Sequence, residues 1–392
     1  MNIKDKKIAI VGGGPGGLTL ARLLQMNGAN VKVYERDINR NVRVQGATLD
    51  LHHDSGLKAL EAAGLMDAFR ANYRPGADKM TVTDKHANIM HKDDFEYGVE
   101  DEFSRPEIDR GPLRDILIDS LKPGTIVWDS QFQSLHIHGD KSVTLRFKNG
   151  TLAHADLVIA ADGANSRIRP YITPIKPFFA GVTVIEGAVY DAEKNAPRVH
   201  KLLQGGKIFA LGDSKTFVVS SKGDGSMAFY MGFKTDEDWV RESGINFSDK
   251  KQVSRWFNYA FAGWDTIWDE LFENASIAFI PRPQYCMPLD QTWTAQPNLT
   301  MLGDAAHLMP PYAGEGVNMA MLDALELSEY LLDERYEDSR QAISAFEEQM
   351  LARTSEMARE TLEQTESMHS PEGLENLVGF FRSNPDHTTT GV

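Results

Sequence analysis

Three glycines near the start of the chain have the spacing of a nucleotide-binding turn. Gly12-x-Gly14-x-x-Gly17 follows the apolar run KIAIV and precedes a segment with helical spacing. In such a turn the first glycine permits a tight bend, the second lets the backbone approach a pyrophosphate, and the third allows a helix to pack closely on a strand. Glu35, at the end of the next apolar run, can accept a hydrogen bond from a ribose hydroxyl. The pattern predicts a dinucleotide site with its phosphates at a helix N-terminus.

Two later motifs favour a flavin over a nicotinamide dinucleotide. In the first, a buried apolar run ends in Asp162-Gly163 and is followed by Ser and Arg residues. In the second, LGDAAHLMPPYAGEGVN, an apolar run delivers Asp304 to the edge of a sheet, where its carboxylate can hold a ribityl hydroxyl. The glycines that follow let backbone amides meet the flavin pyrimidine edge, and the next helix places its N-terminus beside the charge of reduced flavin. Because a simple NAD dehydrogenase needs neither motif, we expect FAD.

The elements that position these motifs follow an α/β pattern. Strand-like runs at 7–11 and 31–34 flank a helical segment at 18–27, which predicts a βαβ unit and a sheet that is parallel at its start. A helix is also expected over 104–121. Between about 176 and 267, short strand-like runs separated by Gly, Asp and Lys predict a mostly antiparallel sheet.

The predicted fold is therefore α/β, with a Rossmann-type FAD-binding domain, a smaller, mostly antiparallel-sheet substrate domain and a C-terminal bridging helix. The bridging helix is expected because apolar residues recur at helical spacing from Ile343 to Leu362. We assign the discontinuous FAD-binding domain to 1–71, 102–175 and 268–340, the substrate domain to 72–101 and 176–267, the bridging helix to 341–370, and a flexible tail to 383–392.

Composition excludes several other classes of protein. The formal net charge is -15, which argues against nucleic acid or an anionic membrane as a partner, since both need a basic surface. Cys286 is the single cysteine, so no intramolecular disulfide can form and nothing indicates an oxidising compartment. The sequence has neither a Cys/His metal cluster nor an apolar run of about 18 residues. We expect a monomeric, cytoplasmic protein whose partners are a small-molecule substrate and O2.

The three motifs, in this order and spanning almost the whole chain, resemble those of the group A flavoprotein monooxygenases with the para-hydroxybenzoate hydroxylase fold. The segments YERDINRNVRVQGATLDLH, RPEIDRGPLRDIL and MLGDAAHLMPPYAGEGVN are most similar to the tetracycline-inactivating TetX-like branch. This resemblance implies an FAD enzyme that consumes NADPH and hydroxylates a polycyclic or aromatic enol or phenol through a flavin C4a-hydroperoxide. Because the flavin carries the chemistry, it implies no catalytic side chain and no metal ion.

The resemblance also implies roles for matching positions. Arg43 corresponds to a position used for NADPH, while Arg114 either contributes to the site or forms an ion pair. His307 is either a proton relay beside the flavin or a packed histidine. The implied FAD-binding residues are Gly12, Gly14, Gly17, Glu35, Arg36, Asp50, Arg110, Asp162, Asp304, Gly316 and Asn318.

The sequence departs from the family in its middle part. Glu186, Lys207 and Ala228 fall where the family has Gln, Arg and His contacts to tetracycline, and Glu315 replaces a loop Gln. We therefore expect weaker or narrower tetracycline activity than is usual for the family. A non-tetracycline aromatic metabolite is the alternative substrate, and a flavin-binding redox sensor is the alternative from another class. The implied substrate residues are Glu186, Lys207, Pro311, Tyr312 and Gly314.

Overall fold

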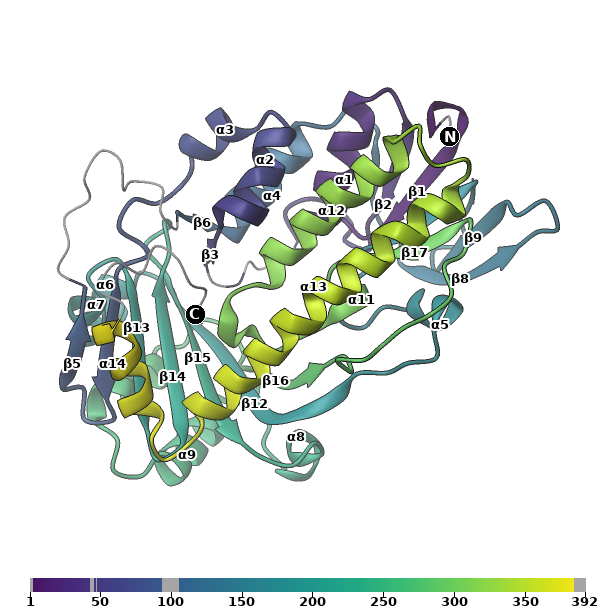
Figure 1. Cartoon of the computed structure of the whole chain (residues 1–392). Coiled ribbons are helices and arrows are strands. Elements are labelled where there is room, and N and C mark those ends of the chain that lie inside the picture. Colours follow the sequence, from purple (N-terminus) through teal and green to yellow (C-terminus); the bar gives the residue numbers. More distant parts are fainter. Residues whose placement is uncertain (1–2, 43–45, 47, 94–105, 384–392) are drawn as a thin grey trace.

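The computed structural model describes residues 3–42, 46, 48–93 and 106–383 (Figure 1). Its first sheet is the predicted parallel sheet, with five strands in the order β17-β11-β1-β2-β7. Every pairing in it is parallel. Strands β1 and β11 are apolar and buried on both faces, as a parallel sheet covered by helices requires. The strands are β1 (Lys7–Val11), β2 (Asn30–Tyr34), β7 (Ile126–Val127), β11 (Leu157–Ala160) and β17 (Leu299–Met301).

Helices pack against this sheet and form the first hydrophobic core with it. The first of them, α1, has Pro15 in its first turn, where a missing N–H costs nothing, and ends just before Gly28, which has a φ of +83°. The expected βαβ unit at the start of the chain is thus confirmed. The helices of this region are α1 (Pro15–Met26), α2 (Lys58–Ala62), α3 (Met66–Arg70), α4 (Arg110–Asp119), α5 (Arg169–Ile172), α11 (Asp304–His307) and α12 (Gly316–Leu332).

The prediction of a helix over 104–121 is wrong for its first residues. Residues Glu107–Asp109 form strand β6, which pairs antiparallel with β3 (Thr48–Asp50), and α4 begins only at Arg110. Ile108 is fully buried opposite Leu49, so burial against a neighbouring strand overrides the local helical spacing. Residues 104 and 105 lie outside the described residues.

The second large sheet has seven strands in the order β16-β12-β15-β14-β13-β4-β5 and is antiparallel except between β13 and β4. The expected mostly antiparallel sheet is therefore confirmed. One face carries an aromatic core that includes Phe217, Phe229, Trp268 and Phe272, covered by the helices that follow the sheet. The strands are β4 (Met80–Asp84), β5 (Ile89–Lys92), β12 (Phe178–Val189), β13 (Lys207–Gly212), β14 (Lys215–Ser221), β15 (Met227–Lys234) and β16 (Ile280–Cys286).

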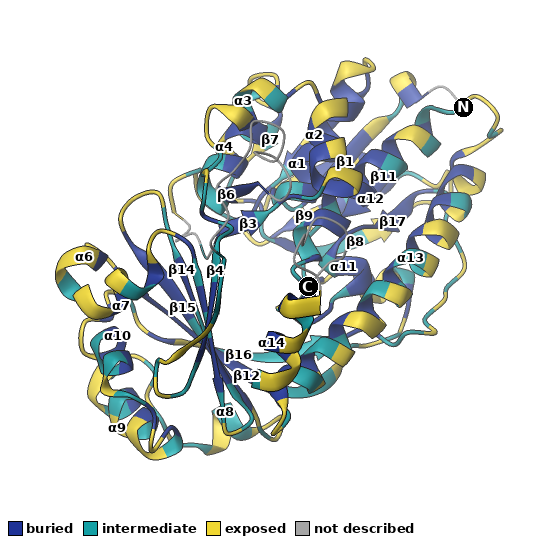
Figure 2. Ribbon diagram, turned by 60° about the vertical axis from the view of Figure 1, so that its left-hand side comes forward, coloured by how far each residue is buried: buried dark blue, intermediate teal, exposed yellow. Residues whose placement is uncertain are grey.

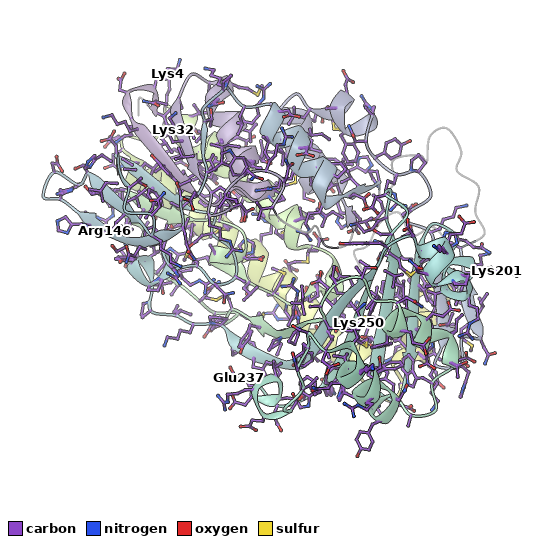
Figure 3. The ribbon with its side chains drawn as sticks, turned by 180° about the vertical axis from the view of Figure 1, so that it is seen from behind. Lys4, Lys32, Arg146, Lys201, Glu237 and Lys250 are labelled. Atoms are coloured by element: carbon purple, nitrogen blue, oxygen red, sulfur yellow. The ribbon has the colours of Figure 1, made fainter. Side chains whose placement is uncertain are left out.

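Smaller elements complete the two parts. A three-stranded antiparallel sheet, β10-β9-β8, lies beside the parallel sheet. In the view from behind, Lys4, Lys32 and Arg146 lie on the part built on the parallel sheet, and Lys201 and Glu237 on the other part (Figure 3). The remaining strands and helices are β8 (Phe132–Ile137), β9 (Val143–Phe147), β10 (Leu152–Ala155), α6 (Ala192–Asn195), α7 (Pro197–Leu203), α8 (Trp239–Glu242), α9 (Lys250–Ala260), α10 (Asp269–Glu273) and the single turns η1 (Ile3–Asp5), η2 (His53–Leu57), η3 (Thr266–Trp268) and η4 (Pro311–Ala313).

The predicted bridging helix is α13 (Ser339–Met368), which runs diagonally from the part built on the parallel sheet to the seven-stranded sheet (Figure 1). Its N-terminal half buries Ile343 and Phe346 in the first core, and its last residue, Met368, packs with Val82 of the seven-stranded sheet. The outward face of the helix is exposed (Figure 2). A further helix, α14 (Gly373–Ser383), was not predicted, and it packs on the seven-stranded sheet. The rest of the predicted tail, 384–392, lies outside the described residues.

The predicted domain boundaries stay a proposal. The segment 268–340, which we assigned to the FAD-binding domain, contributes to both sheets. Its first part supplies Phe272 and Phe279 to the aromatic core, and β16 pairs with β12 over several residues. A boundary just after Cys286 therefore describes these contacts better than one at 268.

Candidate active site

One cavity of about 1260 Å³ lies between the two large sheets. Small-molecule sites have volumes of roughly 300–1,000 Å³, so this cavity has room for more than one small ligand. One wall is built by the glycine turn and by loops that follow strands β11 and β17. The other wall is the face of the seven-stranded sheet opposite its aromatic core. Predicted site residues that line the cavity are Gly12, Gly14, Gly17, Glu35, Arg36, Asp50, Arg110, Asp162, Asp304, Gly316, Glu186, Lys207, Pro311, Tyr312 and Gly314.

The glycine turn has the geometry that its sequence predicts. Gly12 has a φ of +115°, and its N–H donates to the carbonyl of Tyr34 at 2.9 Å. A Cβ atom at Gly17 would lie 2.3 Å from the Gly12 carbonyl oxygen, so only glycine permits this approach of helix to strand. A Cβ atom at Gly14 would meet nothing within 4 Å. The backbone at Gly14 is therefore open to the cavity, as the approach of a pyrophosphate requires.

Glu35 closes this turn from the end of β2. It is 2% exposed, and its two carboxylate oxygens accept hydrogen bonds from the backbone N–H groups of Gly13 at 2.7 Å and Asp37 at 3.0 Å. The side chain thus fixes the glycine turn relative to the following loop, in addition to lining the cavity.

Asp50 ends strand β3 and faces the loop that precedes α12. A Cβ atom at Gly314 would lie 3.5 Å from its carboxylate. Asn318 is fully buried and does not line the cavity; its Nδ2 donates to the carbonyl of Asp50 at 3.0 Å, and its Oδ1 accepts from the N–H of His52 at 3.0 Å. The amide therefore holds the end of β3 against the start of α12, which is a positioning role that the spacing did not reveal.

Asp304 lies at the carboxyl end of β17, inside the cavity wall. Burial raises the pKa of Asp304, an effect that the nearby cations His307, Arg110 and Arg169 oppose. Arg169 is 6% exposed and donates to the carbonyl oxygens of Asp304 at 2.8 Å and Ala305 at 2.7 Å. Arg169 thus fixes the turn that presents the Asp304 carboxylate.

His307 points away from the cavity, so the structure favours a packed histidine over a proton relay. Its Nε2 lies 2.5 Å from Oδ2 of Asp323, and both side chains are almost fully buried. The same carboxylate accepts from the N–H of Gly303 at 2.8 Å and from Arg353 at 2.6 Å. Burial acts to raise the pKa of Asp323, but His307 and Arg353 outweigh it and lower the pKa. The cluster supports the Gly303–Asp304 turn from behind.

The two arginines of α4 have different surroundings. Arg110 lines the cavity, and burial lowers its pKa although Tyr230, Asp304 and Glu186 attract its charge. Arg114 is 4% exposed; it donates to the carbonyl of Gly13 at 3.3 Å and forms an ion pair of 3.1 Å with Asp37. Arg114 is therefore a buried brace between α4 and the glycine turn, and not a surface residue.

The seven-stranded sheet supplies alternate side chains of its strands to the cavity. Glu186 on β12 pairs with Arg282 on β16, with 2.5 Å between Oε2 and Nε. Lys207 at the start of β13 pairs with Glu107, which is 1% exposed. Ala228, the third position at which the sequence departs from the family, is buried and lies outside the cavity lining.

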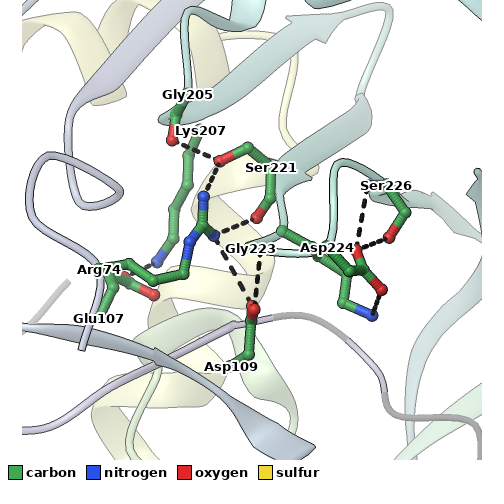
Figure 4. A network of polar contacts seen from close by, with 10 residues as sticks. Arg74, Glu107, Asp109, Gly205, Lys207, Ser221, Gly223, Asp224 and Ser226 are labelled. Atoms are coloured by element: carbon green, nitrogen blue, oxygen red, sulfur yellow. Dashed lines mark hydrogen bonds and ion pairs between the residues drawn. The ribbon is translucent and has the colours of Figure 1, made fainter. Parts of the chain in front are cut away.

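A polar network joins β6 and the loop after α3 to the seven-stranded sheet (Figure 4). Arg74 donates to the carbonyl oxygen of Ser221 at 2.7 Å and to its hydroxyl at 3.0 Å, and it lies 3.7 Å from Asp109. Asp109 also accepts from the N–H of Gly223 at 2.8 Å. Together with the Lys207–Glu107 pair, these contacts fix β6 against the seven-stranded sheet.

The structure thus brings together most of the residues that the sequence singles out. Arg43, implied for NADPH, lies outside the described residues. Sequence reasoning missed one cavity residue on β6 and several on the seven-stranded sheet, although polar residues at alternate positions of the sheet's strands were a usable signal. The missed residues are Glu107, Thr216, Tyr230, Gly232 and Arg282.

The residues present fit a flavin dinucleotide. The open backbone at Gly14 lies at the N-terminus of α1, where free N–H groups attract phosphate. The acidic side chains of Glu35, Asp50 and Asp304 stand along the same wall, where hydroxyl donors of a sugar or ribityl chain can meet them. Within the described parts of the chain, no group of three or more His, Cys, Asp and Glu residues could hold a metal ion. In the same residues, no helix has the length and apolar character needed to cross a membrane.

The sequence pattern of the FAD binding domain family matches residues 5–361, and the chain therefore belongs to this family of flavin-dependent monooxygenases. Monooxygenase asqM of Emericella nidulans is 27% identical over 377 residues, which cover 83% of this chain and 84% of that protein. The 3-amino-4-hydroxybenzoate 2-monooxygenase PtmB3 of Streptomyces platensis is 28% identical over 379 residues, covering 94% of this chain and 89% of that protein.

Among solved structures, tetracycline destructase Tet(55) superposes with a TM-score of 0.75 and 20% sequence identity, covering 100% of this chain and 99% of that chain. At this identity the likeness concerns the fold alone. The fold class expected from the sequence is confirmed, while closeness to the TetX-like branch stays a prediction.

Proposed function

We propose that this protein is an FAD-dependent monooxygenase that consumes NADPH and adds one oxygen atom from O2 to a polycyclic or aromatic enol or phenol. One observation carries the proposal: a single cavity has the glycine turn and Asp304 on one wall and the polar face of the seven-stranded sheet on the other. A substrate held on the second wall would lie beside a cofactor held on the first. The monooxygenase relatives support the reaction class.

When bound, FAD supplies the redox chemistry, taking electrons from NADPH and activating oxygen for transfer to the substrate. The side chains of this chain bind, orient and exclude water. Gly14 and Glu35 would hold the pyrophosphate and adenosine half, with Arg36 beside them. Asp304 would hold the ribityl chain, and the backbone of Gly314 and Gly316 would face the pyrimidine edge. Asp50, Arg110 and Asp162 complete the proposed FAD-binding wall.

The proposed substrate residues are Glu186 and Lys207 on the seven-stranded sheet, and Pro311 and Tyr312 in the loop before α12. Glu186 and Lys207 are each already paired, with Arg282 and Glu107 respectively. A substrate that displaced either partner would leave a buried carboxylate unpaired, and such a ligand is rejected strongly. This supports a substrate other than the usual tetracyclines, with tetracycline itself as the first compound to test because of the sequence resemblance.

The purified protein should be yellow, and denaturation should release FAD and not FMN. NADPH oxidation should then be measured with and without candidate aromatic substrates, and the products analysed by mass spectrometry. A product heavier by one oxygen, formed only with enzyme and O2, is the expected result. A colourless protein that cannot be reconstituted with FAD would contradict the proposal. NADPH oxidation that yields only hydrogen peroxide with tetracycline, with the antibiotic intact, would exclude tetracycline as the substrate.

The NADPH contact rests on resemblance, since Arg43 lies outside the described residues. Arg43→Ala should raise the Michaelis constant for NADPH several-fold and leave the FAD content unchanged. Loss of FAD from this variant would show that the role assigned to Arg43 is wrong.

A further inference from the structure

Three polar groups converge on Gly232, where the loop before α12 meets the seven-stranded sheet. Tyr312 in that loop and Thr216 on β14 line the cavity, while His369 lies just behind them at the end of α13. A Cβ atom at Gly232 would lie 2.4 Å from the hydroxyl of Tyr312, 2.5 Å from Oγ1 of Thr216 and 2.6 Å from Nε2 of His369. The missing side chain at Gly232 is therefore what makes room for the cluster.

The hydrogen bonds of His369 fix which of its nitrogens carries the proton. Its Nδ1 lies 2.8 Å from the carbonyl oxygen of Thr365, and because a carbonyl only accepts, Nδ1 is the donor. The residue is 1% exposed, and burial lowers its pKa, which keeps the ring neutral. Nε2 therefore carries the lone pair and can accept one hydrogen bond. The hydroxyl oxygens of Tyr312 and Thr216 each lie 3.3 Å from it, and Thr216 also hydrogen bonds the hydroxyl of Tyr312, so Thr216 can donate to Tyr312 while Tyr312 donates to Nε2.

Tyr312 keeps its proton, because burial raises the pKa of its hydroxyl. That proton has an acceptor in Nε2 of His369, against which the tyrosine ring packs edge-on at 5.0 Å. With its proton used in this way, the phenol oxygen has only lone pairs to offer a ligand in the cavity.

We propose that Tyr312 is a specificity-determining residue, held by His369 so that its oxygen accepts a hydrogen bond from a hydroxyl or N–H group of the substrate. This inference rests on the proposed function and narrows the substrate class to aromatic compounds with such a donor at this end of the cavity. A methyl ether in the same place would set two oxygens against each other with no hydrogen between them. His369 acts through Tyr312 and is a positioning residue.

The test compares each of two phenols, α-naphthol and para-hydroxybenzoate, with its own methyl ether. Dissociation constants for the FAD-loaded protein are measured from the change in flavin absorbance. At least one phenol should bind about five- to tenfold more tightly than its ether, the effect of one hydrogen bond. In Tyr312→Phe the dissociation constants of the phenol and of its ether should differ by no more than about twofold. Tyr330→Phe is the matched control, because the hydroxyl of Tyr330 bonds Gln349 far from the cavity and the ratio should not change.

The variants of His369 separate positioning from packing. His369→Leu removes the acceptor and frees the Tyr312 proton, so the preference for the phenol over its methyl ether should decrease. His369→Gln offers an amide oxygen in its place and should restore part of this preference. The ring tautomer can be measured without any ligand by ¹⁵N NMR of histidine-labelled protein, with His369→Gln used for assignment. A proton on Nδ1 is expected.

A proton on Nε2, an unchanged ratio in Tyr312→Phe, or binding of neither phenol would each overturn the inference. The proposed function has its own test, since FAD release and O2-dependent NADPH oxidation do not depend on this cluster. A protein that passes those tests but fails these retains the function and loses only the assignment of Tyr312.

Discussion

Nδ1 of His52 lies 3.0 Å from Oε1 of Glu315, which ties the end of β3 to the start of α12. Nε2 of the same ring lies 3.2 Å from Oδ2 of Asp50, so the imidazole stands between two carboxylates. Burial alone would lower the pKa of His52, but hydrogen bonds to Asp50 and Glu315 outweigh it and raise the pKa to about 9. The ring is therefore charged at neutral pH and stabilises both carboxylates, of which that of Asp50 lines the cavity.

Because of this pairing, the unfolding free energy should decrease at alkaline pH. In the unfolded chain His52 titrates near 6.5, so its stabilising effect is complete below that pH and is lost as the pH rises through about 9. Glu315→Gln keeps the shape of the side chain and removes one carboxylate. The variant should lose roughly 1–2 kcal/mol of unfolding free energy at neutral pH and show a shallower fall between pH 6.5 and 9.

Urea unfolding at a series of pH values measures both effects. His200→Gln is the control, since His200 is exposed on α7 and its replacement leaves the His52–Glu315 pair intact, so the dependence of stability on pH that comes from this pair should remain. If the unfolding free energy falls equally steeply with pH in Glu315→Gln and in the wild type, the His52–Glu315 pair does not titrate as described.

The pairing of His52 with Glu315 also shows where sequence reasoning stops. The glycine turn and Asp304 could be predicted because each depends on the residues next to it: a strand, a bend and a helix start. His52 and Glu315 meet only because β3 and α12 pack together, and nothing in either local pattern indicates the other. The same holds for Glu186 and Arg282, which are brought together by the pairing of β12 with β16. Burial against a partner strand likewise decides that Glu107–Asp109 is a strand.

The buried acid behind the Asp304 turn should be important for stability. Asp323 has three partners, His307, Arg353 and the N–H of Gly303, and it is fully buried. Asp323→Ala leaves the buried His307 ring and the N–H of Gly303 without their acceptor and removes one of the two carboxylates of Arg353, so a loss of about 3–5 kcal/mol in unfolding free energy is expected. Glu326→Gln, which removes the more exposed partner of Arg353, should cost no more than about 1 kcal/mol. Urea unfolding measures both losses. Equal losses of unfolding free energy in the two variants would contradict this ranking.

Asp304 should matter for FAD affinity more than for folding. Its carboxylate lines the cavity. Asp304→Ala should weaken FAD binding by about ten- to hundredfold, which corresponds to the roughly 1.5–3 kcal/mol of a hydrogen bond to a charged group. Titration of the apoprotein with FAD measures the affinity. The affinity of Asp304→Asn should lie between those of Asp304→Ala and the wild type. Unchanged affinity in Asp304→Ala would remove this residue from the proposed site.

Two glycines of the turn should separate cofactor binding from folding. A Cβ atom at Gly17 would lie 2.3 Å from the carbonyl oxygen of Gly12 and 3.1 Å from Cβ of Ala161, so helix α1 would have to move away from the sheet. A Cβ atom at Gly14 would extend into open space in the cavity. Gly17→Ala should therefore lower the unfolding free energy of the apoprotein by about 1–3 kcal/mol, as overpacking does.

Gly14→Ala should leave the stability of the apoprotein within about 0.5 kcal/mol of the wild type and still weaken FAD binding at least tenfold, because the added methyl group occupies the space that the pyrophosphate needs. Urea unfolding of the apoproteins and FAD titration give the two quantities for each variant. Should Gly14→Ala bind FAD as tightly as the wild type, the pyrophosphate cannot approach the backbone at Gly14. The cofactor would then have to bind elsewhere in the cavity, even though the turn has the glycine spacing of a dinucleotide site.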